Sequence, residues 1–183
     1  MTNVATQSAS STLMWSGILG LTAVLGSYGL ACVFPFAAFA ALAAITLPHR
    51  QGIALMAAAW TVNQIVGFTL MSYPHDAQAV AWGLIIGAGA IAAFVAARLV
   101  FGRETRLLSP RTLAALAASI IAYQSVMFAG AFALDGFESS TLEIVATVAR
   151  NDAFWFAGLA ALRLALEYGL PRWFGSGRRQ ATA

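Results

Sequence analysis

The sequence predicts an all-α protein that crosses a membrane as a bundle of helices. Apolar runs of about 20 residues recur along the chain, and that length crosses about 30 Å of hydrocarbon. Hydrophobic residues make up 60% of the 183 residues and charged residues only 9%, whereas about a quarter of the residues of a soluble domain are charged. The runs are continuous rather than alternating, which excludes an outer-membrane β-barrel.

The first half of the chain contains three predicted spans. The first, 13–30, follows a polar stretch, 1–12, that we interpret as a short cytoplasmic tail. The second, 34–47, ends before Pro48, because a residue that precedes proline is pushed out of the helical region. The third, 52–72, ends at the turn residues Tyr73-Pro74-His75-Asp76.

The second half of the chain contains three more predicted spans. They are 79–99, 112–134 and 153–170. An arginine-rich loop separates the first two, and an acidic loop that ends at Asp152 separates the last two. A basic cytoplasmic tail, 171–183, follows, so the transmembrane domain is predicted as 13–170.

The first two spans leave an alternative open. As one helix, residues 13–47 would be about 52 Å long, which is too long for one ordinary span. As two spans, the second has only about 14 residues, which is short. We therefore expect either six transmembrane helices, or five and a re-entrant segment at 34–47, in which case the N-terminus lies outside.

The arginines predict the orientation of the bundle. All ten basic residues are arginines and most lie between the predicted spans, where they report topology, and we expect no nucleic-acid partner. With the N-terminus inside, Arg150 alone lies on the outer side. The inner side holds Arg50, Arg98, Arg103, Arg106, Arg111, Arg172, Arg178 and Arg179. The positive-inside rule then predicts a multi-pass protein of a bacterial-type inner membrane with a cytoplasmic C-terminus.

Ten residues are candidate ligand-binding groups. The outer face is predicted to hold Cys32, Phe34, Tyr73, His75, Asp76 and Trp82. Near mid-span lie Asn63, Gln64, Tyr123 and Gln124. Polar side chains at that depth face the bundle interior or a wet cavity, because exposure to lipid is costly.

Each candidate also has a structural interpretation. Asn63, Gln64 and Gln124 are equally well explained as hydrogen-bonding groups between helices. Asp76 follows a proline in a tight turn, where Asp commonly accepts a hydrogen bond from the nearby backbone. Cys32, the only cysteine, is more often a small buried hydrophobe than a ligand.

The remaining ionisable residues predict no catalytic centre. We expect the acidic residues, Asp152 included, to lie outside the middle of the membrane, and Arg163 and Glu167 to pair along one helix face. Neither a cluster of metal-ligand residues nor a phosphate-binding loop or serine nucleophile elbow is present. An enzymatic activity is therefore not expected.

The size, number of spans and topology resemble those of the substrate-binding S-components of energy-coupling-factor vitamin transporters. Within that group, the lone Cys32 near the outer face is similar to the cysteine of the small solitary cobalamin transporters, the BtuM family. That family uses a cysteine thiolate as a ligand to the cobalt of the corrin ring, and a soft thiolate suits late transition metals.

The resemblance implies a function for these groups. Cys32 takes the role of metal ligand to the cobalt of a bound corrinoid, and Phe34, Tyr73, His75 and Trp82 line the ring pocket. Cobalamin is then a substrate taken up from the outer face, and no intrinsic cofactor is expected. The only reaction that the resemblance implies is ligand exchange at the thiolate-bound cobalt. The implied partners are the lipid bilayer and either an energy-coupling membrane subunit with its ATPases or, for a solitary transporter, none.

Two other functions stay open. The chain is also compatible with a non-transporting small subunit or assembly factor of a larger membrane complex, in which polar mid-span residues join subunits and the arginine-rich face meets anionic lipid. A transition-metal permease is disfavoured, because histidine and carboxylate ligands are scarce within the predicted spans.

Overall fold

The structure is a computed structural model that describes residues 3–30, 34–102, 107–134 and 141–170. These residues form six helices, as the sequence predicts, and no strand. The helices are α1 (Asn3–Leu30), α2 (Phe36–Thr46), α3 (His49–Leu70), α4 (Ala77–Phe101), α5 (Pro110–Ala133) and α6 (Leu142–Gly169). The predicted all-α fold is therefore confirmed.

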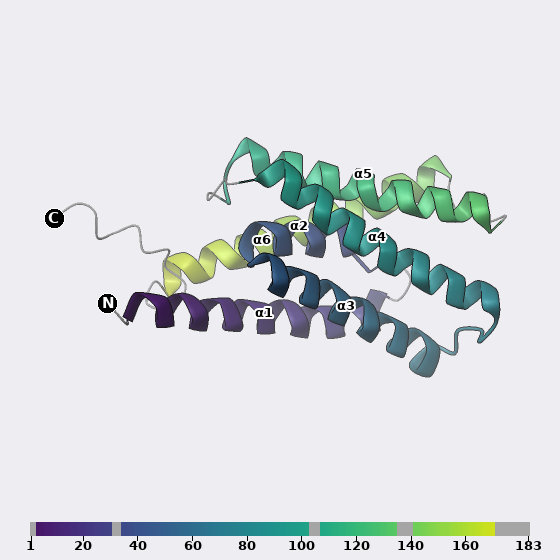
Figure 1. Ribbon diagram of the computed structural model, residues 1–183, viewed down its shortest axis with the longest axis horizontal. Coiled ribbons are helices and arrows are strands. Elements are labelled where there is room, and N and C mark those ends of the chain that lie inside the picture. Colours follow the sequence, from purple (N-terminus) through teal and green to yellow (C-terminus); the bar gives the residue numbers. More distant parts are fainter. Residues whose placement is uncertain (1–2, 31–33, 103–106, 135–140, 171–183) are drawn as a thin grey trace.

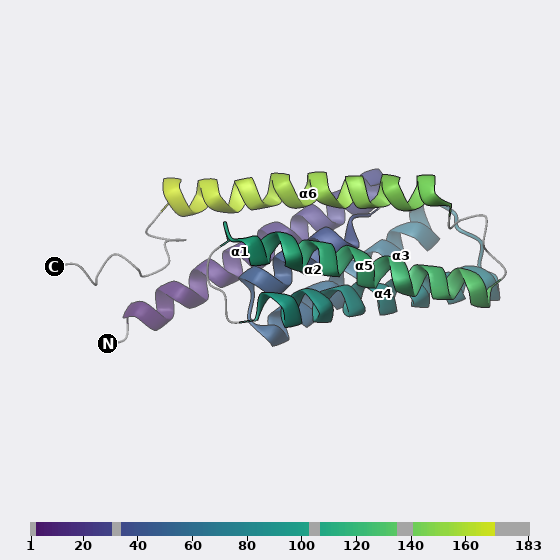
Figure 2. The ribbon, with the colours of Figure 1, turned by 90° about the horizontal axis from the view of Figure 1, so that it is seen from above.

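The helices form an elongated bundle in which α3, α4, α5 and α6 alternate in direction along the long axis (Figures 1 and 2). The start of α1 and the end of α6 lie at the same end of the bundle. We call this the first end, and the opposite one, where α3 turns into α4, the second end. Such alternation follows from the short connections, since a connection of a few residues joins antiparallel neighbours.

Three of the described helices, α3, α4 and α5, are long and apolar enough to cross a membrane. Their boundaries lie within three residues of the predicted spans 52–72, 79–99 and 112–134. Large apolar side chains such as Leu84, Leu99 and Phe132 are more than half exposed on their outer faces. These faces suit contact with lipid rather than with water, which agrees with the predicted membrane character of the chain.

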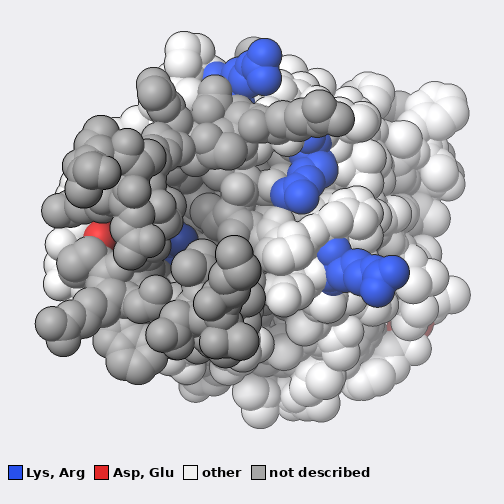
Figure 3. All heavy atoms as spheres, turned by 60° about the vertical axis from the view of Figure 1, so that its left-hand side comes forward, with Lys and Arg blue, Asp and Glu red and all other residues white. Residues whose placement is uncertain are grey.

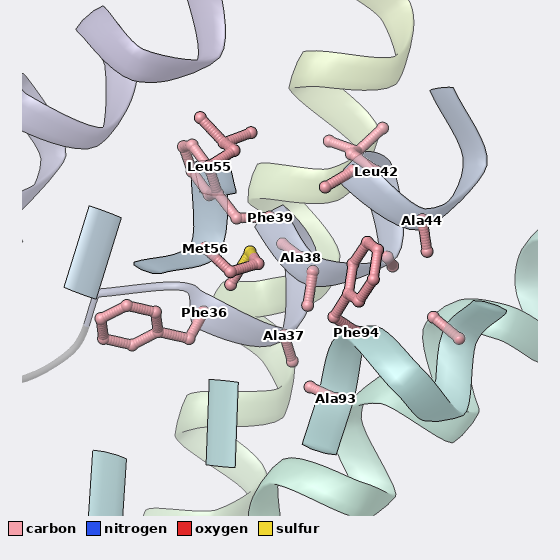
Figure 4. Packing of buried hydrophobic residues seen from close by; sticks show 14 of the residues in the cluster. Phe36, Ala37, Ala38, Phe39, Leu42, Ala44, Leu55, Met56, Ala93 and Phe94 are labelled. Atoms are coloured by element: carbon pink, nitrogen blue, oxygen red, sulfur yellow. The ribbon is translucent and has the colours of Figure 1, made fainter. Parts of the chain in front are cut away.

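Helix α2 is the centre of the bundle. Each residue from Phe36 to Ala44 is at most 2% exposed, and the helix packs against α3, α4, α5 and α6. Figure 4 shows its alanines and phenylalanines against Met56 of α3 and Phe94 of α4. Alanine on nearly every face lets four helices approach one short helix, because small residues allow close backbone contact.

The length of α2 differs from the span predicted at 34–47. Its 11 residues rise about 16 Å, which is about half of the hydrocarbon thickness, so α2 does not cross a membrane by itself. Helix α1 ends well before the second end, α2 runs back toward the first end, and α3 runs toward the second end (Figure 1). The α1–α2 pair is thus a hairpin whose open side faces the first end, which is the chain direction of the two-span alternative with a second helix shorter than predicted.

Two helix starts also differ from the predictions. Helix α1 begins at Asn3, inside the predicted tail. Helix α6 begins at Leu142, eleven residues before the predicted start at 153, because Thr141 caps it by accepting a hydrogen bond from the Ile144 N–H at 3.4 Å. The earlier start places Asp152 in the bundle rather than in an outer loop.

The described arginines are divided between the two ends largely as predicted. Arg50 opens α3, Arg98 lies in the last turn of α4 and Arg111 opens α5, all at the first end. Figure 3 shows basic side chains gathered at this end of the molecule. Arg150 lies toward the opposite end of α6, so the asymmetry on which the orientation was predicted is present in the fold.

Candidate functional site

A recess of about 210 Å³ opens between α3 and α4 near the second end. Three candidate residues line it, namely Asn63, Gln64 and Tyr73, together with Phe68 and the α4 residue Ile86. The lining therefore combines amide groups with aromatic and aliphatic walls, as small-molecule sites usually do. Its volume is below the roughly 300–1,000 Å³ of ordinary ligand pockets.

Glycines shape this recess. A side chain at Gly67 would meet the ring of Tyr73, whose Cε2 atom would lie 2.6 Å from the added Cβ. A side chain at Gly83 would overlap the amide of Gln64. The absence of a side chain at both glycines thus leaves room for groups that line the recess. Asn63 and Gln64 both line it, and a long hydrogen bond of 3.4 Å joins their amides.

The other candidates at the second end lie beside this recess. His75 is exposed, with its ring centroid 5.5 Å from that of Phe68. Asp76 caps α4 by accepting a hydrogen bond from the Ala79 N–H at 2.7 Å, which confirms the structural interpretation of this residue. Trp82 is partly buried and is not among the residues that line the recess.

The remaining described candidates lie in the buried centre. Phe34 is 3% exposed and packs edge-on against Phe36, with 4.6 Å between ring centroids. Tyr123 of α5 stacks on Phe36, with 6.1 Å between ring centroids. Gln124 has a buried Nε2 atom without a partner among the described residues.

The structure thus divides the predicted pocket into two groups. Asn63, Gln64 and Tyr73 share the recess, whereas Phe34 and Tyr123 pack around the start of α2. Cys32, the predicted cobalt ligand, lies outside the described residues. Among the described residues no group of three or more His, Cys, Asp or Glu side chains is placed to hold a metal ion.

The start of α2 is held by a carboxylate from another helix. Asp152 of α6 is 1% exposed, and its Oδ1 atom accepts a hydrogen bond from the Ala38 N–H at 2.9 Å. Pro35 at the N-cap offers no side-chain cap, so Asp152 supplies the acceptor that the first turn of a helix needs. Ser119 of α5 donates a hydrogen bond to the Ala37 carbonyl at 2.7 Å.

The end of α2 is held by a cation. The Nη1 atom of Arg98 donates to the carbonyls of Ala44 and Leu47, the latter at 3.0 Å. Trp15 of α1 donates to Thr46 Oγ1 at 2.8 Å. Arg98 complements the negative end of the α2 dipole, and Asp152 supplies a hydrogen-bond acceptor at the start, so side chains from two other helices hold α2 at both ends.

Asp152 and Arg98 build the centre of the bundle, a role in which neither was predicted. Asp152 was assigned to the acidic loop, although Asp152, Phe156 and Leu159 recur at the spacing of one helix face, and all three are buried. That spacing was the available signal. The pairing of Arg163 with Glu167 is confirmed, with Nε and Oε1 2.8 Å apart.

Comparisons with protein-family models, with curated proteins and with solved structures give no match for this chain.

Proposed function

We propose that this chain is a membrane uptake protein that binds a small solute at the second end of its helix bundle. The observation that carries the proposal is the recess between α3 and α4, where Asn63, Gln64 and Tyr73 present amide and phenol groups beside aromatic and aliphatic walls. Polar side chains within membrane-spanning helices are costly, and they commonly mark a substrate pathway.

The architecture around α2 supports the same proposal. A helix of half the membrane thickness, surrounded by four others, places the ends of a helix dipole inside the bundle. Transporters use such discontinuous helices near the membrane midplane to build binding sites. The carboxyl group and the guanidinium that hold the two ends of this central helix come from two other helices, α6 and α4.

In its specific form, the proposal takes cobalamin or a related corrinoid as the solute and Cys32 as the ligand to cobalt. This form rests on the resemblance to the S-components and on the affinity of thiolates for late transition metals. The recess of about 210 Å³ is smaller than a corrin ring requires, so corrinoid binding requires α3 and α4 to separate at the second end.

The proposed location is a bacterial-type inner membrane with the arginine-rich first end and the C-terminus in the cytoplasm. Arg50, Arg98 and Arg111 at this end support that orientation. The solute then enters from the outside, because the recess lies at the opposite end.

The experiment adds cobalamin to the purified protein and follows the corrin absorbance. We expect binding with a shift of the corrin bands that Cys32→Ala abolishes, because the thiolate no longer replaces the native axial ligand. Asn63→Leu is expected to weaken binding without changing the bands of whatever corrinoid still binds. An unchanged shift in the alanine variant contradicts the cobalt ligation, and absence of corrinoid binding contradicts the choice of substrate.

A second candidate, a subunit of a larger membrane complex, is favoured by one other observation. An apolar groove of about 650 Å³ follows α3 and α4 on their outer side and is lined in part by Ala57, Gly87 and Ala88. Small residues let a neighbouring transmembrane helix approach closely. Native mass spectrometry of gently solubilised protein separates the two functions. A protein partner of fixed stoichiometry supports the subunit of a larger complex, whereas a bound small molecule supports the uptake protein.

A further inference from the structure

Asp152 is the most deeply buried ionisable group among the described residues. Its side chain is 1% exposed, and only Oδ1 is used, as the acceptor for the first turn of α2. The second oxygen, Oδ2, is buried and has no hydrogen-bond partner among the described residues. A helix start and an unpartnered carboxylate oxygen therefore meet inside the bundle.

No described cation balances this carboxylate. Helix α2 has no ionisable side chain. The ionisable group that α5 presents to Asp152 is the phenol of Tyr123. Along α6 itself, Arg150 is exposed, and Arg163 is paired with Glu167. From α1, Trp15 approaches α6 with its ring 5.3 Å from the Arg163 guanidinium.

The space around Asp152 limits what can neutralise it. Neither the recess between α3 and α4 nor the apolar groove on their outer side is lined by Asp152. A third hollow, of about 420 Å³ between α5 and α6, is lined by Phe156 and Ala160 but not by Asp152. A metal ion needs several oxygen ligands, and among the described residues no group of three or more His, Cys, Asp or Glu side chains is placed to supply them. A proton requires neither a cavity nor further ligands.

We propose that Asp152 is a proton-binding site of the bundle. While α2 packs against α6, an O–H bond on Oδ2 neutralises the carboxyl group, and Oδ1 continues to accept from Ala38. When α2 moves away and water reaches the carboxyl group, the O–H bond breaks, the proton passes to water and the carboxylate carries its negative charge. One proton is bound and one released in each cycle, so charge and atoms balance.

Proton binding at Asp152 gives the proposed uptake an energy source. This coupling of proton binding to uptake rests on the proposed function. Helix α2 lies between Pro35 and Pro48, which interrupt the helical hydrogen bonding on both sides of it. A short helix with such boundaries moves as one unit, and its position relative to Asp152 then decides whether the proton is held. Proton movement down its gradient would thereby be coupled to movement of α2.

The experiment compares wild type, Asp152→Asn and Glu143→Gln in detergent, with the folding equilibrium measured from pH 5 to pH 8. In the unfolded chain an aspartate is ionised over this range, so folding takes up one proton and the wild type loses stability as the pH rises. We expect the folding equilibrium constant to fall by up to tenfold per pH unit. Asp152→Asn keeps an acceptor for the Ala38 N–H and is expected to remove this pH dependence. The matched control is Glu143→Gln, because Glu143 is exposed on the same helix, and this variant is expected to keep the pH dependence of the wild type.

An Asp152→Asn variant with the slope of the wild type overturns the proposal. Infrared spectroscopy of the wild type provides a measurement that does not depend on the folding of a variant. A protonated carboxylic acid has a carbonyl band that shifts in D₂O, and its presence near pH 6 is the expected result, while its absence overturns the proposal. Failure of cobalamin to bind leaves both readouts intact, so the two proposals fail separately.

Discussion

Removal of Arg98 should destabilise the bundle, because this side chain is the partner of carbonyls at the end of α2. In a continuing helix the Ala44 carbonyl would accept from the N–H four residues later, but that residue is Pro48 and has none. Arg98 fills this gap by donating to the carbonyls of Ala44 and Leu47. Its positive charge also complements the negative end of the α2 dipole.

The size of the effect follows from these two contributions. A buried carbonyl that loses its partner costs about 1–3 kcal/mol, and a lost charge at a helix end about 0.3–1 kcal/mol. Arg98→Met keeps the length of the side chain and removes both contributions, so we expect a loss of about 1–4 kcal/mol in the free energy of unfolding. Arg98→Lys retains the charge and a donor nitrogen but lacks the planar guanidinium, and it should lose about half as much.

The assay is reversible unfolding in mixed micelles with increasing sodium dodecyl sulfate, followed by circular dichroism. Arg111→Met is the matched control, since Arg111 is exposed in the first turn of α5 at the same end of the bundle. We expect the control to unfold like the wild type. Equal stability of Arg98→Met and Arg111→Met would refute the role of Arg98 in holding α2.

Two glycine substitutions test the packing of α3 against α4. Gly52→Ala places a methyl group on the ring of Phe94 and is expected to destabilise the bundle by about 1–3 kcal/mol in the same assay. The control Gly158→Ala, where nothing lies within 4 Å of the added methyl, should not destabilise it. Gly83→Ala displaces only the flexible amide of Gln64, so we expect near-normal stability but roughly 2- to 10-fold weaker ligand binding in a titration. A Gly52→Ala variant as stable as its control, or a Gly83→Ala variant with unchanged affinity, would contradict this packing.

Much of the candidate recess could be predicted from polar residues within apolar segments. Asn63 and Gln64 interrupt a run that is otherwise apolar, and Tyr73 belongs to the turn that ends it. The cost of exposing amides to lipid was enough to direct them inward. The sequence could not show that Phe34 and Tyr123 pack around α2 instead, because both are also ordinary core aromatics.

The sequence by itself determined the helical class, the three long apolar helices and the unequal distribution of arginine, since each of these depends on local composition and run length. Only the tertiary structure decided that α2 is a half-length central helix and that Asp152 and Arg98 hold its two ends. The physical reason is that a helix end can be satisfied by any donor or acceptor that the fold brings near it. Asp152 and Ala38 are 114 residues apart in the chain, and no local pattern specifies such a partner.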